Sequence, residues 1–219
     1  MGSIMNIVKK IIKWIRFKLQ VGLKRGFCEF HHFPFDAMQP LTNYAYETMA
    51  DACNILDRIG VKYRLTDGTA LGLYRQGEFI KHDNDIDVDI FEVDQNDIKL
   101  LINNFIANGY LIGRVAVYNG QVQQVIFYDE NNVIFDIVIW YQNNKLYVNN
   151  SEKGYVRTQE AKYFQSLTEW QYNGFRYQMP GFLEEWMVMR YGPDWKIPKT
   201  YKGDWKDDCF DIKKIVEEG

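Results

Sequence analysis

The sequence predicts an α+β fold in which a mixed or antiparallel β-sheet is flanked by helices. Apolar residues recur at nearly i, i+4 spacing between Leu41 and Ile59, the pattern of an amphipathic helix. From Asp85 to Glu92, carboxylates alternate with β-branched residues, which is the two-residue period of a strand. Asn119-Gly120 separates two strand-like runs, and both residues tolerate the positive φ of a tight hairpin. Hairpins of this kind, without a repeated βαβ unit, argue against an all-parallel sheet.

The other elements follow from local signals along the chain. Asp36 can cap the helix that contains Leu41, and Gly60 ends it because glycine readily adopts the left-handed conformation. Asn143-Asn144 and Asn173-Gly174 indicate two further hairpin turns. In chain order we expect an irregular link at 27–34, a helix reaching 59, a short strand at 61–66, one or two helical turns at 70–75, a strand at 85–92, a helix at 97–107, strands at 110–118, 121–128 and 133–141, two short strands around 173–174, and a helix at 182–191.

Composition indicates a globular protein with one folded domain. The chain has 219 residues, of which 47% are hydrophobic, so it can bury a substantial core. Its net charge of −3 argues against a general affinity for nucleic acid. Cys28, Cys53 and Cys209 are isolated from one another, which favours a reducing compartment and argues against a disulfide framework or a structural zinc site. We therefore expect a cytoplasmic protein.

The N-terminal segment, residues 1–26, predicts a basic amphipathic helix ahead of a single domain spanning 27–219. Its apolar residues follow helical spacing between Ile4 and Leu19, and lysines and arginines occupy most of the positions between them. These charges interrupt every apolar run, so the segment cannot span a bilayer. Residues 4–25 could instead lie on the inner face of an anionic membrane. The alternative is a helix that packs on its own domain or on a partner subunit.

Asp85-Ile86-Asp87 is the central chemical feature of the sequence. Two carboxylates at positions i and i+2 of a strand project from the same face, with Cα atoms about 6 to 7 Å apart. Without a counter-ion they would repel each other and raise each other's pKa. A divalent cation such as Mg²⁺ or Mn²⁺, which prefers oxygen ligands, would remove that conflict. We therefore predict that Asp85 and Asp87 bind a metal.

Asp136 is the expected third member of this site. It is the single carboxylate in the apolar run from Val133 to Ile139, where an unpaired buried charge would be costly. If this strand lies beside that of Asp85, three carboxylates converge and can hold one or two metals. Two alternatives remain: Asp136 could pair with a buried arginine, or the aspartates could form the solvated face of an edge strand. Asp89 also allows Asp87 and Asp89 to be the ligand pair.

Asp67-Gly68-Thr69 precedes the short helix predicted at 70–75. Glycine lets the backbone approach a phosphate group closely, the following N–H groups can donate to it, and the Thr69 hydroxyl adds a donor. A single Gly-Thr pair is a weak signal. The combination is far more specific: a strand, the Gly-Thr turn, a strand with Asp-x-Asp and a third aspartate follow one another along the chain.

Taken together, the segment from Tyr63 to Arg75 and the run Asp83-Asn84-Asp85-Ile86-Asp87 resemble the signature of the LicD/fukutin family. Residues 191–198, with Gly203-Asp204-Trp205 after them, resemble its fukutin branch in particular. The resemblance implies a nucleotidyltransferase-like sheet flanked by helices. It also implies a phosphotransferase that uses Mg²⁺ (or Mn²⁺), a CDP-linked donor and a glycan or lipid-linked glycan acceptor. The expected reaction transfers ribitol phosphate, phosphocholine or a similar alcohol phosphate and releases CMP.

The resemblance also assigns roles to individual residues. Asp85, Asp87 and Asp136 match the catalytic and metal-binding aspartates, Gly68 and Thr69 match the phosphate loop, and Arg75 matches an arginine that could bind the donor phosphate. Asn84 departs from the pattern, since family members often have an acidic residue immediately before the Asp-x-Asp pair. Two other functions stay open: a nucleotidyltransferase that moves a nucleoside monophosphate and releases pyrophosphate, and an inactive binding module of the same fold.

Aromatic residues toward the C-terminal end allow two interpretations. They could form a cage for a quaternary ammonium group or a surface on which cytosine stacks. More often such residues belong to the hydrophobic core. The residues concerned are Trp170, Trp186, Tyr191, Trp195 and Trp205.

Overall fold

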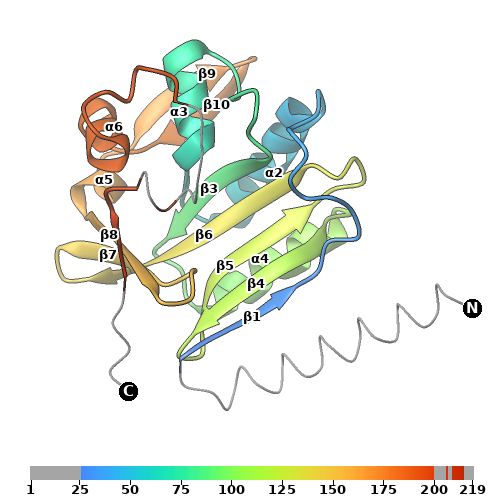
Figure 1. Ribbon diagram of the computed structural model, residues 1–219. Coiled ribbons are helices and arrows are strands. Elements are labelled where there is room, and N and C mark those ends of the chain that lie inside the picture. The colour runs from blue at the N-terminus through green and yellow to red at the C-terminus, as the bar shows by residue number, and fades with distance from the viewer. Residues whose placement is uncertain (1–25, 200–205, 207–208, 215–219) are drawn as a thin grey trace, which may run out of the picture.

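The centre of the protein is a nine-stranded mixed sheet (Figure 1). The structure, a computed structural model, describes residues 26–199, 206 and 209–214. Seven strands follow the order β1-β4-β5-β6-β7-β8-β11, while β3 pairs with β6 in parallel and with β2 in antiparallel orientation. A separate two-stranded sheet is formed by β9 and β10. The strands are β1 (Phe27–His31), β2 (Tyr63–Leu65), β3 (Asp85–Phe91), β4 (Leu111–Tyr118), β5 (Gln121–Tyr128), β6 (Ile134–Asn143), β7 (Leu146–Asn149), β8 (Tyr155–Glu160), β9 (Thr168–Tyr172), β10 (Phe175–Met179) and β11 (Ile212–Lys214).

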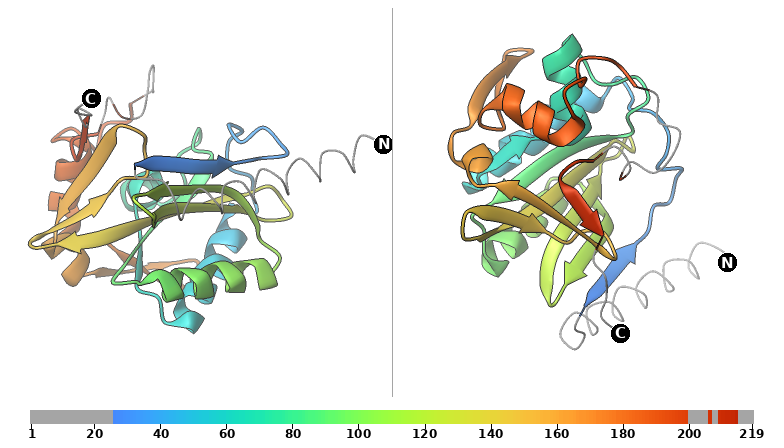
Figure 2. Two further views of the ribbon diagram at one scale, coloured as in Figure 1. Left: turned by 90° about the horizontal axis from the view of Figure 1, so that it is seen from below. Right: turned by 60° about the vertical axis from the view of Figure 1, so that its left-hand side comes forward.

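The described helices lie in two groups. Helices α2 and α4 cover the same face of the sheet, as the left view of Figure 2 shows. Helices α3 and α6 lie with the β9–β10 hairpin at one end of the molecule (Figure 1). The helices are α2 (Ala45–Ile59), α3 (Asp67–Gln76), α4 (Gln95–Ala107), α5 (Lys162–Gln165) and α6 (Leu183–Tyr191).

Turn and cap residues set the boundaries of these elements. Asn119 and Gly120 have φ values of 49° and 80°, so they form the predicted tight turn between β4 and β5. Gly60 ends α2 with φ 72°, also as predicted. The Asp94 side chain accepts hydrogen bonds from the backbone of Asn96 and Asp97 at the start of α4. The sequence-predicted hairpins and the C-terminal end of α2 are therefore confirmed, whereas the predicted start of this helix was wrong: α2 begins at Ala45 after Tyr44, and Asp36 does not cap it.

The hydrophobic core lies between the central strands and helices α2 and α4. Phe105 of α4 stacks on Phe127 of β5, with ring centroids 4.5 Å apart, and lies 5.8 Å from Phe135 of β6. Phe135 is the register partner of Ile86, so Ile86 faces these helices. Because side chains alternate along a strand, Asp85 and Asp87 project from the opposite face.

Several predicted boundaries were wrong. The link expected at 27–34 contains β1, whose residues pair in antiparallel register with β4 at the edge of the sheet, with Phe30 buried in the core. Helix α3 begins at Asp67 rather than Ala70, so the Gly-Thr pair belongs to its first turn. Strands β8 and β11 were not anticipated.

The predicted N-terminal helix, and with it the membrane contact through residues 4–25, lies outside the described residues. Among the helices that the structure describes, none combines the length and the apolar character that crossing a bilayer requires.

Candidate metal and phosphate site

Asp87 is held in place by the first turn of α3. The Asp87 backbone N–H donates to Thr69 Oγ1 at 2.9 Å, and the Thr69 N–H donates to Asp87 Oδ2 at 3.3 Å. Thr69 is fully buried. These contacts are those of a residue that orients the Asp87 carboxylate, while the predicted contact of Thr69 with phosphate remains a prediction.

A third carboxylate, Asp83, joins Asp85 and Asp87. Each of the three side chains offers an oxygen atom, and these atoms all lie within 4.8 Å of one another. We call these three residues the aspartate triad. Asp83 precedes the strand at the same two-residue spacing, so the sequence pattern Asp83-x-Asp85-x-Asp87 indicates this third residue, which the prediction from the strand alone did not include. The neighbouring Asn84 instead donates its side-chain amide to the Ala37 carbonyl at 2.6 Å.

The triad carries more negative charge than its surroundings balance. Burial raises the pKa of Asp83 to about 6, even though Asp85 and the Asn84 backbone act in the opposite direction. Burial followed by the charge of nearby aspartates raises the pKa values of Asp85 and Asp87 well above the ordinary range. Asp83 Oδ2 is buried without a hydrogen-bond partner among the described residues. A divalent cation fits this donor set, because hard oxygen ligands and unbalanced negative charge are what it requires.

Asp136 lies on β6 directly opposite Asp87 in the parallel register, so the two strands are neighbours as expected. Its oxygen atoms are not part of the group within 4.8 Å. Instead, Gln124 Nε2 donates to both of them, at 2.8 and 2.6 Å, and Arg114 donates in turn to Gln124 Oε1. Burial raises the Asp136 pKa to about 7, while Gln124 and Arg114 lower it. Asp136 is thus beside the triad with its own hydrogen-bond partner, and its role in metal binding remains a prediction.

Asp89, the alternative ligand, is occupied by an arginine. Arg64 Nε and Nη2 donate to Asp89 Oδ2 at 2.9 and 2.7 Å, and neither side chain is exposed to solvent. The same guanidinium donates to the Tyr163 carbonyl and to Gln159. The charge of Asp89 is thus balanced by Arg64 inside the protein, whereas Asp85 and Asp87 form no ion pair with a described residue.

Because Gly68 has no side chain, the carboxylates of the triad can occupy the space beside it. A Cβ atom at this position would lie 2.2 Å from Asp83 Oδ2 and 3.3 Å from Asp87 Oδ2. The backbone of α3 can therefore approach the carboxylates only because residue 68 has no side chain.

Gly68→Ala should weaken divalent-cation binding by about tenfold or more, because the added methyl group displaces the Asp83 carboxylate. The fold should survive, since that carboxylate ends a side chain that can rotate. Titration with Mn²⁺, followed by calorimetry, measures the affinity. In an Asp83→Asn background, Gly68→Ala should lower the Mn²⁺ affinity little further, because the carboxylate that it displaces is already absent. If the two substitutions instead lowered the affinity by fully additive amounts, Gly68→Ala would act by a route other than Asp83.

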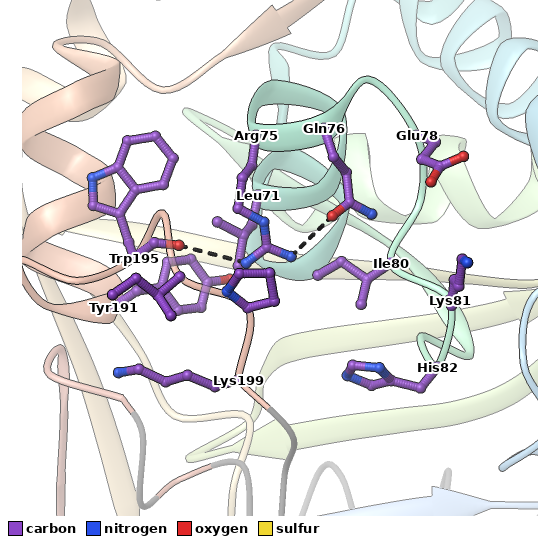
Figure 3. Close-up of a pocket in the computed structure, with 12 residues that line it drawn as sticks. Leu71, Arg75, Gln76, Glu78, Ile80, Lys81, His82, Tyr191, Trp195 and Lys199 are labelled. Carbon is purple, nitrogen blue, oxygen red and sulfur yellow. Dashed lines mark hydrogen bonds between the residues drawn. The ribbon is translucent and has the colours of Figure 1, made fainter.

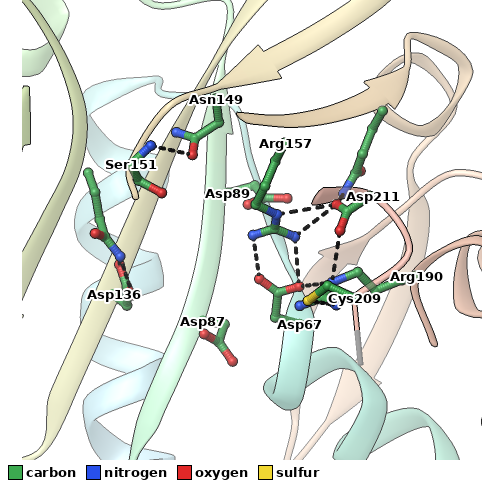
Figure 4. Close-up of polar contacts among 12 residues, drawn as sticks. Asp67, Asp87, Asp89, Asp136, Asn149, Ser151, Arg157, Arg190, Cys209 and Asp211 are labelled. Carbon is green, nitrogen blue, oxygen red and sulfur yellow. Dashed lines mark hydrogen bonds and ion pairs between the residues drawn. The ribbon is translucent and has the colours of Figure 1, made fainter. Parts of the chain in front are cut away.

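Sequence reasoning also missed the ion pairs of Asp67, the first residue of α3. Arg157 Nη1 and Nη2 donate to its two oxygens at 2.9 and 3.0 Å, and Arg190 Nε donates to Oδ1 at 2.6 Å (Figure 4). Both arginines also contact Asp211, which lies at the start of β11. We call these four residues the Asp67 network. It ties β8, α6 and the C-terminal segment to the turn that contains Gly68, a connection that no local sequence pattern reveals.

Arg75 lines a cavity of about 370 Å³ (Figure 3). His82, the residue before Asp83, lines the same cavity, as does Tyr191, whose pKa is raised by burial and further by the charges of Asp67 and Asp87. Arg75 contacts the Trp195 carbonyl at 3.5 Å and Gln76 at 3.2 Å. Among the described residues, no carboxylate forms an ion pair with it, and its Nε is buried without a partner. The guanidinium is therefore available to an anion.

The aromatic residues divide between core and cavity. Trp186 is fully buried and donates its indole N–H to Gln159, so it belongs to the core. Trp195 and Tyr191 line the cavity, and Trp195 stacks on Tyr74 with ring centroids 5.6 Å apart. Trp205 lies outside the described residues. A cage formed by all of these residues together is excluded by the position of Trp186.

A mixed sheet that carries an Asp-x-Asp strand beside a helix beginning with a Gly-Thr turn defines a nucleotidyltransferase-like domain. The sequence model described as "LicD/FKTN/FKRP, nucleotidyltransferase domain" matches residues 60–181, more than half of the chain. The protein therefore belongs to the LicD/FKTN/FKRP family, and the predicted family and fold class are confirmed.

Two relatives are named "Ribitol-5-phosphate transferase FKTN", one from Macaca fascicularis and one from Homo sapiens. Each is 28% identical over 167 residues, which cover 74% of this chain. The match covers 35% of each relative, so the chain spans about a third of the length of these proteins. The "Uncharacterized protein RP689" of Rickettsia prowazekii is 30% identical over 74 residues, covering 34% of this chain and 28% of that protein.

Solved structures with a similar course of the chain include the lincosamide antibiotic adenylyltransferase LnuA in its lincomycin-bound form. That structure has a TM-score of 0.45 and 16% sequence identity, covering 65% of this chain and 82% of LnuA. An antigenic nucleotidyltransferase-like protein from Paracoccidioides brasiliensis has a TM-score of 0.41 and 13% identity, covering 68% of this chain and 67% of that one.

Proposed function

We propose that the protein transfers an alcohol phosphate, such as ribitol phosphate or phosphocholine, from a CDP-linked donor to a glycan or lipid-linked glycan acceptor and releases CMP. Family membership supports a transferase, and the name of the FKTN relatives supports ribitol phosphate as the transferred group. We place this activity in the cytoplasm, at the inner face of the membrane, because the basic segment at residues 4–25 has the composition of a membrane-surface helix.

One observation carries the proposal: the aspartate triad and Arg75 carry opposite charges that lack partners among the described residues, and the Arg75 cavity is lined by His82, the residue before Asp83, and by Tyr191, whose pKa the charge of Asp87 helps to raise. The aspartate triad has no described cation-bearing side chain in an ion pair with it, and Arg75 has no carboxylate among the residues described. A diphosphate accompanied by Mg²⁺ (or Mn²⁺) would supply both missing partners at once. Asp83, Asp85 and Asp87 would hold the cation, which when bound neutralises negative charge on the diphosphate.

The residues of the chain would then have separate tasks. Arg75 holds a donor phosphate through charge-assisted hydrogen bonds from a fixed guanidinium. Thr69 keeps the Asp87 carboxylate oriented through its two hydrogen bonds. Asp136 receives the proton of the attacking hydroxyl, because its pKa of about 7 suits a general base near neutral pH. Gln124 positions Asp136 by donating to both of its oxygens.

Incubating the protein with CDP-ribitol, CDP-choline or CDP-glycerol should release CMP only when Mg²⁺ is present. Chromatography of the products distinguishes this reaction from nucleotidyl transfer, which would consume a nucleoside triphosphate and release pyrophosphate. Arg75→Gln should raise the donor KM by about 10- to 100-fold, since a hydrogen bond to a charged group contributes about 1.5–3 kcal/mol.

Arg176→Gln is the matched control, because the Arg176 side chain is 72% exposed on the β9–β10 hairpin. Its KM should stay at the wild-type value. Pyrophosphate as the released product would favour the nucleotidyltransferase alternative. A protein that shows no Mg²⁺-dependent rise in melting temperature with any of these donors would instead be a binding module without this activity.

A further inference from the structure

A second cavity is lined by Asn84, the residue between Asp83 and Asp85 of the aspartate triad. It measures about 220 Å³ and is formed where the link between β1 and α2 meets the loop between β5 and β6. Residues from both segments and from the start of β3 line it, among them Phe35, Asp36, Gln39, Asn84, Asn131 and Asn132. We call it the amide cavity, after the four side-chain amides in that group.

The amide cavity borders the triad directly. Asn84, which lines it, is bonded on one side to Asp83 and on the other to Asp85. Ile134, another lining residue, is the register partner of Asp85 on β6. The cavity that contains Arg75 reaches the triad from the opposite direction along the chain, through His82. Each cavity thus has a lining residue next to Asp83 in the chain, and Leu41 of the amide cavity donates its backbone N–H to the Asp83 carbonyl at 2.8 Å, so groups bound in both cavities could meet at the triad.

The two cavities differ in charge. Arg75, Lys81 and Lys199 line the first and outnumber its one carboxylate, Glu78, so it suits an anion. Among the described residues that line the amide cavity, none is a lysine or an arginine. Asn and Gln side chains each present both a donor and an acceptor, and the carboxylate of Asp36 adds acceptors. Together with the ring of Phe35, this combination matches a neutral ligand that has many hydroxyl groups and apolar C–H faces.

Part of this lining is held in place before any ligand binds. Gln39 Nε2 donates to Asp36 Oδ2 at 2.8 Å, and Asn84 Nδ2 donates to the Ala37 carbonyl at 2.6 Å. The loop after β5 is fixed by Asp129, which accepts hydrogen bonds from the backbone N–H groups of Asn131 and Val133, each at 2.9 Å. Preorganised polar groups lower the entropic cost of binding.

We propose that the amide cavity binds a neutral polyhydroxylated group and so brings a hydroxyl-bearing substrate to the triad. The idea rests on the proposed function for its place in the reaction, although binding itself can be tested separately. Two sources share this chemistry: the sugar of the acceptor, and the alcohol half of the donor.

Amide NMR spectra of the full-length protein, titrated with ribitol and with the neutral disaccharide lactose, test the binding. We expect shifts in the side-chain amide signals of Gln39, Asn84, Asn131 and Asn132. Asn131→Leu should weaken the binding by roughly fivefold, the contribution of one neutral hydrogen bond, because it removes an amide at a position without positive φ. Asn103→Leu, on the exposed surface of α4, is the matched control and should leave the affinity unchanged. Absence of shifts at these amides, or equal affinities in both variants, would overturn the proposal.

Affinities for CDP-ribitol and CDP, compared in the wild type and in Asn131→Leu, distinguish the two sources. If the alcohol half of the donor occupies the cavity, CDP-ribitol binds more tightly than CDP and the variant loses that advantage. If the acceptor sugar occupies it, the ratio of the two affinities stays constant while lactose still shifts the amides. Sugar binding at the cavity without any Mg²⁺-dependent binding of CDP would reject the proposed donor and leave this inference standing.

Discussion

Asp87→Asn should lower the rate of CMP release by about 10²- to 10³-fold, since stabilisation by a bound metal is worth several kcal/mol. The same substitution should raise the melting temperature of the metal-free protein. Asp87 is partly buried, and both its desolvation and the charges of Asp85 and Asp83 oppose its ionisation, so a neutral amide of the same shape removes that unfavourable contribution. Activity and unfolding temperature thus move in opposite directions. Product chromatography and differential scanning calorimetry measure the two effects.

Asp51→Asn provides the control for this experiment. Asp51 is an exposed residue of α2, so its replacement should leave both quantities near the wild-type values. Added Mg²⁺ should raise the melting temperature of the wild type and of this control, but hardly that of Asp87→Asn. If Asp87→Asn kept full turnover, the assignment of Asp87 to the metal site would be wrong.

The sequence predicted the elements that depend on local chemistry. The turn at Asn119-Gly120 and the end of α2 at Gly60 follow from backbone preferences of single residues, and both are present. The strand of Asp85 follows from its two-residue period. Long-range pairing is different: that β3 runs parallel to β6, and that β11 pairs with β8, is set by contacts between segments distant in the sequence. Local periodicity carries no information about such partners.

The same distinction holds for the candidate site. Asp85 and Asp87 could be selected from their spacing and apolar surroundings. Asp83 follows the same spacing, but it lies before the strand, where alternation is not yet required by sheet pairing. The partners of Asp67 could not have been predicted, because Arg157, Arg190 and Asp211 come from three elements that meet only in the folded protein.

Asp67→Asn should destabilise the protein by about 3–5 kcal/mol, the usual cost of removing one member of a buried ion pair. The Asp67 network contains two carboxylates and two guanidinium groups, and the substitution leaves one positive charge in excess among side chains that are nearly buried. Backbone strain does not complicate the comparison: Asp67 has φ 40°, and asparagine tolerates positive φ at least as well as aspartate. Urea unfolding measures the loss. Asp194→Asn, at an exposed pair with Lys199, should cost less than about 1 kcal/mol.

The effect of Asp67→Asn should also depend on pH. Burial alone would raise the Asp67 pKa, but Arg157 and Arg190 outweigh it and hold the pKa below its ordinary value of 3.8. A carboxyl group whose pKa is lowered by folding stabilises the protein above its unfolded-state pKa and loses that contribution as the pH falls. The difference in unfolding free energy between wild type and variant should therefore be largest near neutral pH and shrink below about pH 4.

A double variant separates charge balance from shape. Arg190→Met in the Asp67→Asn background restores equal numbers of positive and negative groups, so the two substitutions together should cost less than the sum of their separate effects. Strict additivity would mean that the ion pairs contribute little and that packing at the start of α3 dominates. Because α3 also carries Gly68 and Thr69, loss of the Asp67 network should weaken Mn²⁺ binding at the triad as well. The C-terminal segment, through Asp211, would then support a site formed by residues more than a hundred positions earlier in the chain.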